Sequence, residues 1–240
     1  MSRSGRPPAP PDPPEATRPA PARLVLARHA QSTWNGLGKI QGQLDPSLSE
    51  RGREEAERLA ERLGDKRWAA FYSSDLARCR ETAAPLAGRL GREPVTLGDL
   101  REIYLGEWEG LTRHELEQRY PELWQRWLHE PSWDLVPGGE GAKSFELRVD
   151  RVIKRLLDEH PEGDILVVTH GGVIQVALGH TIGRNSAGLF PFRISNASIT
   201  TIEHGPQRLI VSSVNDVCHL SSPLGGEGRG VAPGSGALTA

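Results

Sequence analysis

The chain has 240 residues, a formal net charge of −2 and 25% charged residues of both signs. This balance gives no electrostatic case for a nucleic-acid partner, and no apolar run approaches the roughly 20 residues that a membrane-spanning helix needs. The amino terminus lacks the apolar stretch of a secretory signal, and the two cysteines are too few for a disulfide framework. We therefore expect a reduced cytoplasmic protein with no nucleic-acid or membrane partner.

The two ends of the chain differ in composition from its middle. Residues 1–21 are dominated by Pro, Ala and charged residues, and residues 221–240 by Gly, Ser, Pro and Ala. Such segments bury too little apolar surface to offset the entropy lost on ordering, so we predict two disordered tails. The intervening residues 22–220 are long enough for a single domain.

The middle of the chain alternates between strand and helix patterns. Short continuous apolar runs predict buried strands, and apolar residues three or four positions apart predict helices. In chain order we expect a strand at 23–28, a helix at 49–63, a strand at 68–75, a helix at 76–90, a strand at 94–97, a strand at 164–170, a helix at 171–182 and a hairpin of strands at 197–204 and 207–214, joined by "GPQ". In the first helix we expect Ser49 to be the N-cap, Gly64 to be the stop, and the buried face to hold Ala56, Leu59, Ala60 and Leu63. This alternation predicts an α/β domain with a mostly parallel sheet.

Polar side chains that could bind a ligand or take part in catalysis follow three of these strands. Arg28 and His29 come at the end of the first strand, Arg78 lies just past the second, and His170 ends the strand at 164–170. The carboxyl ends of parallel strands share one edge of a sheet, and open α/β sheets bind ligands outside that edge. The sequence therefore predicts that these four side chains converge on one ligand site.

Two arginines and two histidines at one edge suit a dianionic ligand. The planar guanidinium group matches the oxygens of a phosphate, and Gly171 and Gly172 open a helix whose first N–H groups could add to an anion site. Either histidine alone could be an ordinary packed residue, but two at matching strand ends favour a function. Zinc is an alternative, although a catalytic site needs a third protein ligand and the arginines would repel a cation.

Five motifs follow one another at regular spacing: "LVLARHAQSTWN", "QGQLDPSLSERG", "FYSSDLARCRETA", "LREIYLGEWEG" and "LVVTHGG". In this order they resemble the histidine phosphatase superfamily, the phosphoglycerate mutase-like proteins, over roughly residues 23–219. The resemblance implies a three-layer sandwich in which helices flank a mostly parallel central sheet. "NASITTIEH" and "NDVCHL" resemble the closing strands of the family, and we interpret Asn196 and His219 as structural.

The resemblance also implies roles for the converging residues. His29 matches the nucleophile that becomes phosphohistidine, and His170 is the second catalytic histidine. Arg28, Arg78 and His170 match the residues that clamp the phosphoryl oxygens. The backbone N–H of Gly171, at the start of the predicted helix, would add to this clamp. A neutral imidazole can attack phosphorus only when the negative oxygens are neutralised, so the implied chemistry needs neither a metal nor a cofactor.

Two further positions carry over with less support from the residues themselves. Asn35 matches a position near the phosphate, and Glu102 aligns with the proton donor of the phosphatase branch. On the residues alone, Glu102, Glu107 and Glu109 are equivalent candidates, because carboxylates in such a loop are usually solvated. The family usually has Gly after the catalytic His, and this chain has Ala30, which disfavours a positive φ and narrows the approach to a ligand.

The same residues could support a hydrolase, a mutase or a binding protein. Mutases of this family typically continue from the acid with Arg-His-Tyr-Gly, whereas Glu102 is followed by "IYLGEWEG", as is common among the phosphatases. We therefore predict a metal-independent phosphomonoester hydrolase whose partner is a small phosphorylated metabolite. A cofactor-dependent phosphoglycerate mutase, a non-catalytic phospholigand-binding protein and an inert scaffold remain alternatives. The sequence leaves a homodimer open.

The segment 104–145 is a predicted insertion that holds four of the six tryptophans. One interpretation makes it a cap or lid that lines the pocket. The other, commoner use of tryptophan is a small packed subcore. Glu140 resembles a family position at the rim of the pocket.

Overall fold

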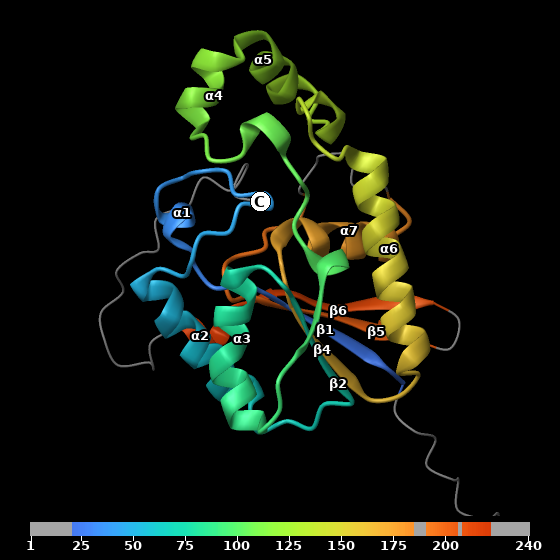
Figure 1. The fold of residues 1–240 in the computed structure, drawn as a ribbon. Helices are drawn as coiled ribbons and strands as arrows, with labels where there is room; N and C mark the ends of the chain where they lie inside the picture. The colour runs from blue at the N-terminus through green and yellow to red at the C-terminus, as the bar shows by residue number, and fades with distance from the viewer. Residues whose placement is uncertain (1–20, 185–190, 206–207, 222–240) are drawn as a thin grey trace, which may run out of the picture.

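The computed structural model describes residues 21–184, 191–205 and 208–221. Apart from Pro21 and Ser221, the two predicted tails lie outside these ranges, as do residues 206 and 207 of the predicted "GPQ" turn. Six strands form one sheet in the order β3-β2-β4-β1-β5-β6 (Figure 1). Their bounds are β1 (Arg23–Arg28), β2 (Ala70–Ser74), β3 (Val95–Leu97), β4 (Asp164–Thr169), β5 (Ile199–His204) and β6 (Leu209–Asp216).

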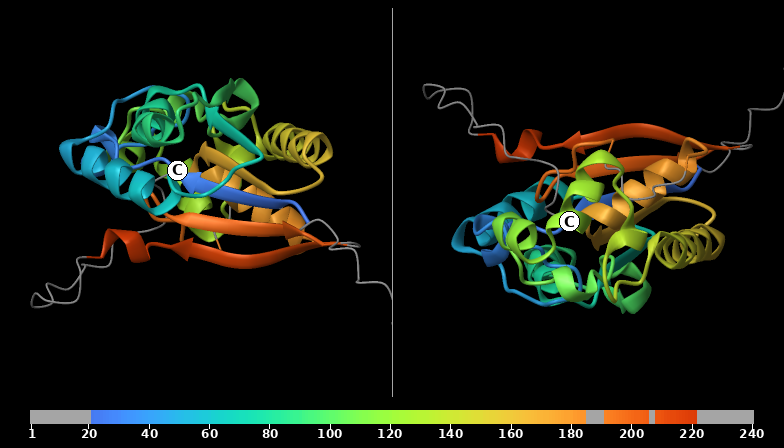
Figure 2. Two further views of the ribbon diagram at one scale, coloured as in Figure 1. Left: turned by 90° about the horizontal axis from the view of Figure 1, so that it is seen from below. Right: turned by 90° about the horizontal axis from the view of Figure 1, so that it is seen from above.

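The first four strands are parallel and the last two are not. β1 pairs with β4, β4 with β2 and β2 with β3 in parallel register. β5 runs antiparallel to β1, and β6 runs antiparallel to β5 and forms an outer edge of the sheet (Figure 2). The mostly parallel sheet and the closing antiparallel pair are both confirmed, with β6 two residues later than predicted.

Helices cover both faces of the sheet. Their bounds are α1 (Thr33–Gly36), α2 (Glu50–Leu63), α3 (Ala77–Leu90), α4 (Arg113–Arg119), α5 (Pro121–His129), α6 (Ala142–Glu159) and α7 (Gly171–Thr181). Apolar residues of α2 and α3 pack with one face of β1, β2 and β4, and those of α6 and α7 pack with the other. The predicted three-layer α/β sandwich is therefore confirmed. Within the described ranges, no helix is both long and apolar enough to cross a lipid bilayer.

Local sequence explains where α2 begins and which face it buries. The side chain of Ser49 accepts a hydrogen bond from the N–H of Gly52, as expected of an N-cap. Leu59, Ala60 and Leu63 are buried against the sheet at helical spacing. Both the predicted start and the predicted face of this helix are confirmed.

The longest helix, α6, lies in a region that the predicted elements leave unassigned. Phe145, Val149, Val152, Ile153 and Leu156 recur at helical spacing and are buried against the core. The sequence therefore contains the apolar pattern of this helix, directly after the tryptophan-rich segment.

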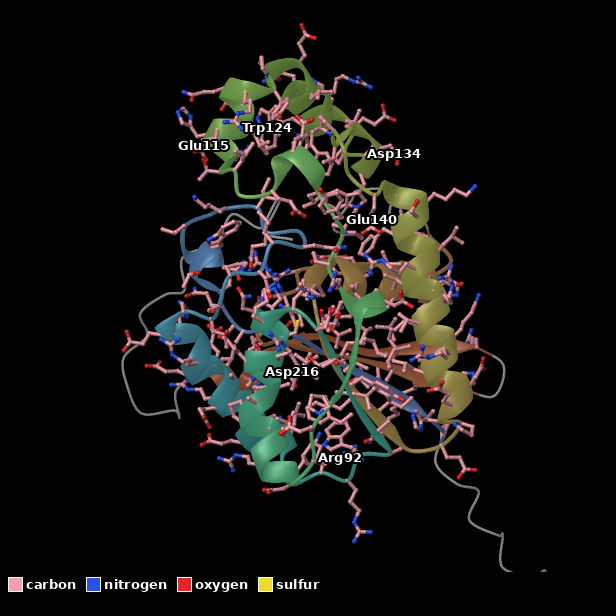
Figure 3. All side chains as sticks on the ribbon, viewed as in Figure 1. Arg92, Glu115, Trp124, Asp134, Glu140 and Asp216 are labelled. Atoms are coloured by element: carbon pink, nitrogen blue, oxygen red, sulfur yellow. The ribbon has the colours of Figure 1, made fainter. Side chains whose placement is uncertain are left out.

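The tryptophans of the insertion form a packed subcore. Trp108, Trp124, Trp127 and Trp133 are each at most 4% exposed, and the ring centroids of Trp127 lie 5.2 Å from Trp108 and 4.9 Å from Trp133. Such edge and tilted contacts are favourable for aromatic rings. α4 and α5 project from the body of the molecule around this cluster (Figures 1 and 3). A lid function for the segment stays a prediction.

Candidate active site

The two predicted catalytic histidines meet at the carboxyl edge of the sheet. In the β1–β4 register Arg28 lies opposite Thr169, so the residues that follow, His29 and His170, leave the sheet at the same level. The N–H of His29 donates to the carbonyl of Thr169 at 2.8 Å. The two imidazole centroids are 5.3 Å apart. The predicted convergence of the two strand ends is thus present in the structure.

His29 is held as a neutral imidazole with one nitrogen free to react. Its Nδ1 lies 2.8 Å from the carbonyl oxygen of Ala30, which can only accept, so Nδ1 carries the proton and Nε2 keeps its lone pair. Burial lowers the pKa of His29 well below its usual value, and the charges of Arg78 and Arg28 lower it further. At neutral pH the ring therefore has the form that a nucleophile requires.

His170 is oriented from the opposite side by β2 and α3. Its Nε2 lies 2.9 Å from the hydroxyl of Ser74 and 3.4 Å from the thiol sulfur of Cys79. Burial, Arg78 and the neighbouring histidine lower the pKa of His170 well below its usual value. Both imidazoles are therefore neutral, and the positive charge of the site resides on arginines.

Arg28 and Arg78 bring buried positive charge to the site. Arg78 donates to the carbonyls of Leu44 and Gly42, at 2.8 and 2.7 Å, and its buried Nε has no hydrogen-bond partner among the described residues. Arg28 donates to the carbonyl of Ile194 at 2.6 Å. Burial lowers the pKa of Arg28 to about 10, which leaves it charged at neutral pH. A buried guanidinium group that donates to carbonyls and keeps an unpaired N–H, as Arg78 does, suits an anionic ligand.

Glu102 lies against the first turn of α7. Its Oε2 accepts from the N–H of Gly172 and its Oε1 from the N–H of Ile103, both at 3.0 Å. Burial raises the pKa of Glu102, and this effect outweighs the two hydrogen bonds and the charges of Arg78 and Arg28, which lower it. A carboxyl group with a raised pKa, coupled to both arginines, can donate a proton beside the anion site.

The structure separates the three acidic candidates of this loop. Glu107 is exposed and accepts from the hydroxyl of Tyr120 at 2.6 Å. Glu109 accepts from the N–H groups of Gln43 and Leu105, at 2.7 and 3.0 Å, and so fixes two loops to each other. Of the three, Glu102 is the fully buried one that contacts α7, and the charges of both Arg78 and Arg28 act on it.

Asn35 and Gly171 border the site. The side-chain oxygen of Asn35 accepts from the N–H of Ser32, which closes the capping box of α1. Asn196 Nδ2 donates both to this oxygen, at 3.2 Å, and to the carbonyl of His29, at 3.1 Å. Gly171 begins α7, and a Cβ built on it would lie 3.5 Å from Arg28 Nε. Direct contact of Asn35 and Gly171 with phosphate stays a prediction.

One part of the predicted anion site is different in the structure. We expected the N–H groups of both Gly171 and Gly172 to face the anion. The N–H of Gly172 instead donates to Glu102, because the carboxyl group packs directly on the helix terminus, where backbone donors are unpaired. The N–H of Gly172 therefore holds the carboxyl group of Glu102, and it does not face the predicted anion.

Ala30 does not strain the backbone. Among the described residues, the non-glycine positions with positive φ are Ala197 and Asn215. The N–H of Ala30 donates to Thr82 Oγ1 at 2.9 Å, and Thr82 donates in turn to the carbonyl of Arg78. The conformation after His29 therefore suits alanine, so no positive φ is strained. The narrower approach of a ligand stays a prediction.

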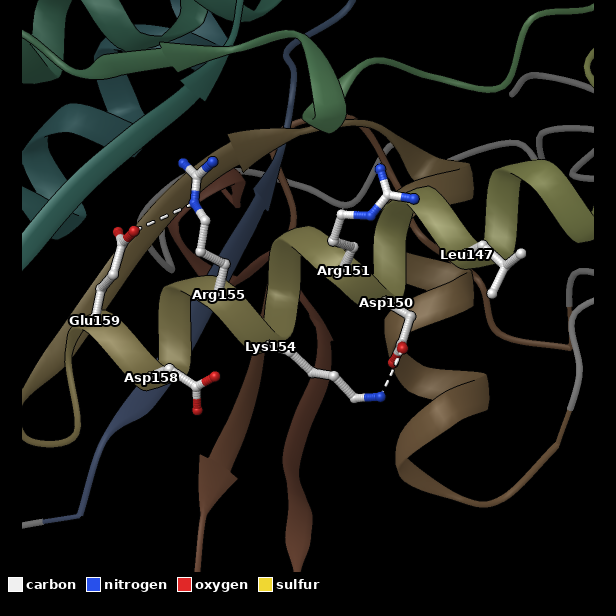
Figure 4. A pocket seen from close by; sticks show the side chains of 7 residues that line it. All are labelled: Leu147, Asp150, Arg151, Lys154, Arg155, Asp158 and Glu159. Carbon is white, nitrogen blue, oxygen red and sulfur yellow. Dashed lines mark hydrogen bonds and ion pairs between the residues drawn. The ribbon is translucent and has the colours of Figure 1, made fainter.

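The described residues offer no metal cluster, and the depression on α6 is lined by none of the predicted site residues. Within the described part of the chain, no group of three or more His, Cys, Asp or Glu residues is placed to hold a metal ion. A shallow depression lies on the outer face of α6 (Figure 4). It is lined by Leu147, Asp150, Arg151, Lys154, Arg155, Asp158 and Glu159. Two ion pairs, Lys154–Asp150 and Arg155–Glu159, cross this exposed surface.

Sequence reasoning missed five supporting residues: Ser74, Cys79, Thr82, Gly172 in its role toward the acid, and Asn196 in its contact with the His29 carbonyl. Ser74, Cys79 and Thr82 lie in the same motif as Arg78, and this closeness in sequence could have indicated that they are near the site. The contacts of Gly172 and Asn196 join segments far apart in the chain, so no local sequence pattern predicts them.

The chain is similar in sequence to known phosphatases. The family model of the histidine phosphatase superfamily (branch 1) matches residues 24–217. Phosphoserine phosphatase 1 of Hydrogenobacter thermophilus is 33% identical over 198 residues, which are 82% of this chain and 94% of that protein. The metal-independent phosphoserine phosphatase of Arabidopsis thaliana is 35% identical over 204 residues, which are 83% of each chain.

Solved structures agree with this similarity. A mycobacterial glucosyl-3-phosphoglycerate phosphatase, complexed with VO3, superposes with a TM-score of 0.73 at 32% identity and covers 80% of this chain and 98% of its own. A phosphoserine phosphatase mutant from Entamoeba histolytica, in complex with phosphoserine, gives a TM-score of 0.74 at 27% identity and covers 83% and 100% of the two chains. The family predicted from the five motifs is confirmed: the chain belongs to the histidine phosphatase superfamily, branch 1.

Proposed function

We propose that this chain is a metal-independent phosphomonoesterase that acts through a phosphohistidine intermediate on a small phosphorylated metabolite. The observation that carries the proposal is the state of His29. It is buried and neutral, its Nδ1 lies 2.8 Å from the Ala30 carbonyl so that Nε2 keeps the lone pair, and its ring centroid lies 5.3 Å from that of His170. The charges of Arg78 and Arg28 act on the same ring. A carboxyl group with a raised pKa, Glu102, stands beside the same arginines.

In the first step the Nε2 lone pair of His29 attacks phosphorus, and the nitrogen–phosphorus bond forms as the phosphorus–oxygen bond to the leaving group breaks. The arginines stabilise the charge on the phosphoryl oxygens in surroundings with little water, where such interactions are strong. The leaving alkoxide takes a proton from Glu102, which becomes a carboxylate.

In the second step the ionised Glu102 takes a proton from water, and the water oxygen attacks phosphorus. The nitrogen–phosphorus bond breaks, its electron pair returns to His29 Nε2, and inorganic phosphate leaves. The protonated carboxyl and the neutral imidazole are then restored, so the cycle balances without a metal or a cofactor.

The relatives support a phosphatase acting on a small metabolite. These relatives are named for phosphoserine and glucosyl-3-phosphoglycerate. We propose a substrate of that class, a phosphate ester of a small polar metabolite. A cytoplasmic location and the lack of a nucleic-acid partner stay predictions from composition and charge, and a homodimer stays open. A mutase is the second candidate and would transfer the phosphoryl group of His29 to a second hydroxyl instead of water.

Phosphate release in the presence of EDTA tests the proposal. The wild type should hydrolyse p-nitrophenyl phosphate under these conditions, and a panel containing phosphoserine, sugar phosphates and 3-phosphoglycerate would rank the substrates. Release of phosphate without isomerised phosphoglycerate supports the hydrolase. Isomerisation with little phosphate release would assign the mutase, and dependence on added metal would overturn the proposal.

A further inference from the structure

Arg148, on α6, uses every N–H donor of its side chain on one network. Nη1 donates to the carbonyls of Asp99 and Arg101 at 2.9 and 2.8 Å, and Nη2 donates to the carbonyl of Glu102 at 3.2 Å. The remaining donors go to Glu140, with Nη2 at 2.6 Å from Oε1 and Nε at 3.3 Å from Oε2. One guanidinium group therefore fixes three carbonyls in the segment that carries the catalytic acid.

Glu140 holds the other end of the same segment. Its Oε1 also accepts from the N–H of Tyr104 at 2.8 Å, and its own N–H donates to the carbonyl of Tyr104 at 3.1 Å. It stands where the α4–α5 segment joins the body of the molecule (Figure 3). The ion pair of Arg148 and Glu140 thus holds the backbone on both sides of Glu102.

The Arg148–Glu140 ion pair is largely buried, and this burial restricts the positions that its side chains can take. Its side chains are 16% and 18% exposed, and the guanidinium carbon of Arg148 lies 5.0 Å from the ring centroid of Phe145. Partly buried, bidentate pairs are stronger and more directional than surface pairs. Among the described residues, neither side chain is hydrogen-bonded to the side chains of His29, His170 or Glu102. The charge of Arg148 also lowers the pKa of His170, and a lysine at this position would keep that charge.

We propose that Arg148, together with Glu140, is a positioning residue that sets where the carboxyl group of Glu102 stands relative to the leaving group. The proposal deepens the proposed function and rests on it, because it requires Glu102 to be the acid. Lysine at position 148 retains the charge but concentrates its three donors on one nitrogen, and it cannot hold three carbonyls and a carboxylate together.

The test compares two esters in a double-mutant cycle. Release of phosphate is measured with glycerol phosphate, whose alkoxide needs a proton, and with p-nitrophenyl phosphate, whose leaving group does not. Arg148→Lys should lower kcat for the alkyl ester by about 10 to 100-fold and for the aryl ester by less than about threefold. In the Glu102→Gln background the same substitution should leave the ratio of the two rates unchanged.

Arg155→Gln is the matched control, because Arg155 lies on the same helix in an exposed ion pair with Glu159 (Figure 4) and should change neither rate. If Arg148→Lys does not fold, Glu140→Gln gives the same comparison. Equal losses on both esters, or a ratio that still changes in the Glu102→Gln background, would overturn the positioning role while leaving the phosphatase intact. No turnover by the wild type would overturn the proposed function and this inference together.

Discussion

Replacing Gly172 with alanine tests how closely Glu102 packs on α7. A Cβ at this position would overlap with Glu102 Oε1 and lie 3.3 Å from Phe145 Cζ. Because normal contacts between such atoms are about 3.5 Å, the carboxyl group must move by roughly 1 Å. The hydrogen bond from the Gly172 N–H, 3.0 Å long here, would be distorted by the same movement.

The expected size of the effect follows from the role of the acid. A displacement of about 1 Å costs roughly 100-fold in rate when a group must be aligned with a reacting atom. This loss corresponds to about 2.7 kcal/mol in activation free energy. Stability should change less, because the roughly 1 kcal/mol gained by replacing a helical glycine opposes the strain of crowding.

The assay is kcat with glycerol phosphate beside kcat with p-nitrophenyl phosphate. Gly172→Ala should lower the first by about 100-fold and the second by less than about tenfold, since nitrophenolate leaves without a proton. Gly88→Ala on α3 is the control, because a Cβ there meets no atom within 4 Å. Equal losses on both esters, or no loss at all, would refute the placement of Glu102 as the acid.

Three further results are expected. Because His29 has a lowered pKa and must be neutral, and Glu102 has a raised pKa and must be protonated, kcat/KM with an alkyl phosphate should peak at mildly acidic to neutral pH. A flat profile from about pH 5 to about pH 9, or a basic limb that survives Glu102→Gln, would contradict these roles. Ala30→Gly should lower the free energy of unfolding by about 1–2 kcal/mol, measured by chemical denaturation, and should not raise kcat. A higher kcat would contradict the finding that alanine leaves the backbone at this position unstrained. Iodoacetamide should label exposed Cys218 but not Cys79, whose pKa is raised by burial, and native labelling of Cys79 would refute its enclosure.

The sequence was most informative where local pattern and topology act together. Strand ends in a parallel sheet share one edge, so the positions of Arg28, His29, Arg78 and His170 follow from finding three buried strands. Burial and helical spacing likewise predicted α2 and its N-cap. These features depend on neighbours in the chain, and a single sequence displays them.

Features made by long-range contacts could not be predicted in this way. The choice of Glu102 over Glu109 depends on which carboxyl group reaches the first turn of α7, and it came from a resemblance and not from the residues. Arg148 sits on a helix that the predicted elements leave out, and its partners lie up to 49 positions away. The tryptophan cluster could also have lined a pocket, because composition does not show which way the rings face.

The most direct test of the account is to trap the phosphoenzyme. The wild type would be mixed with an activated phosphate ester in EDTA, quenched with alkali and examined for phosphoprotein that survives base but is lost in acid, as phosphohistidine is. We predict such a species in the wild type, with the phosphoryl group on the peptide that contains His29, and none in His29→Ala. Turnover by His29→Ala at the wild-type rate, or a phosphoryl group on another residue, would contradict the assignment of His29 as the nucleophile.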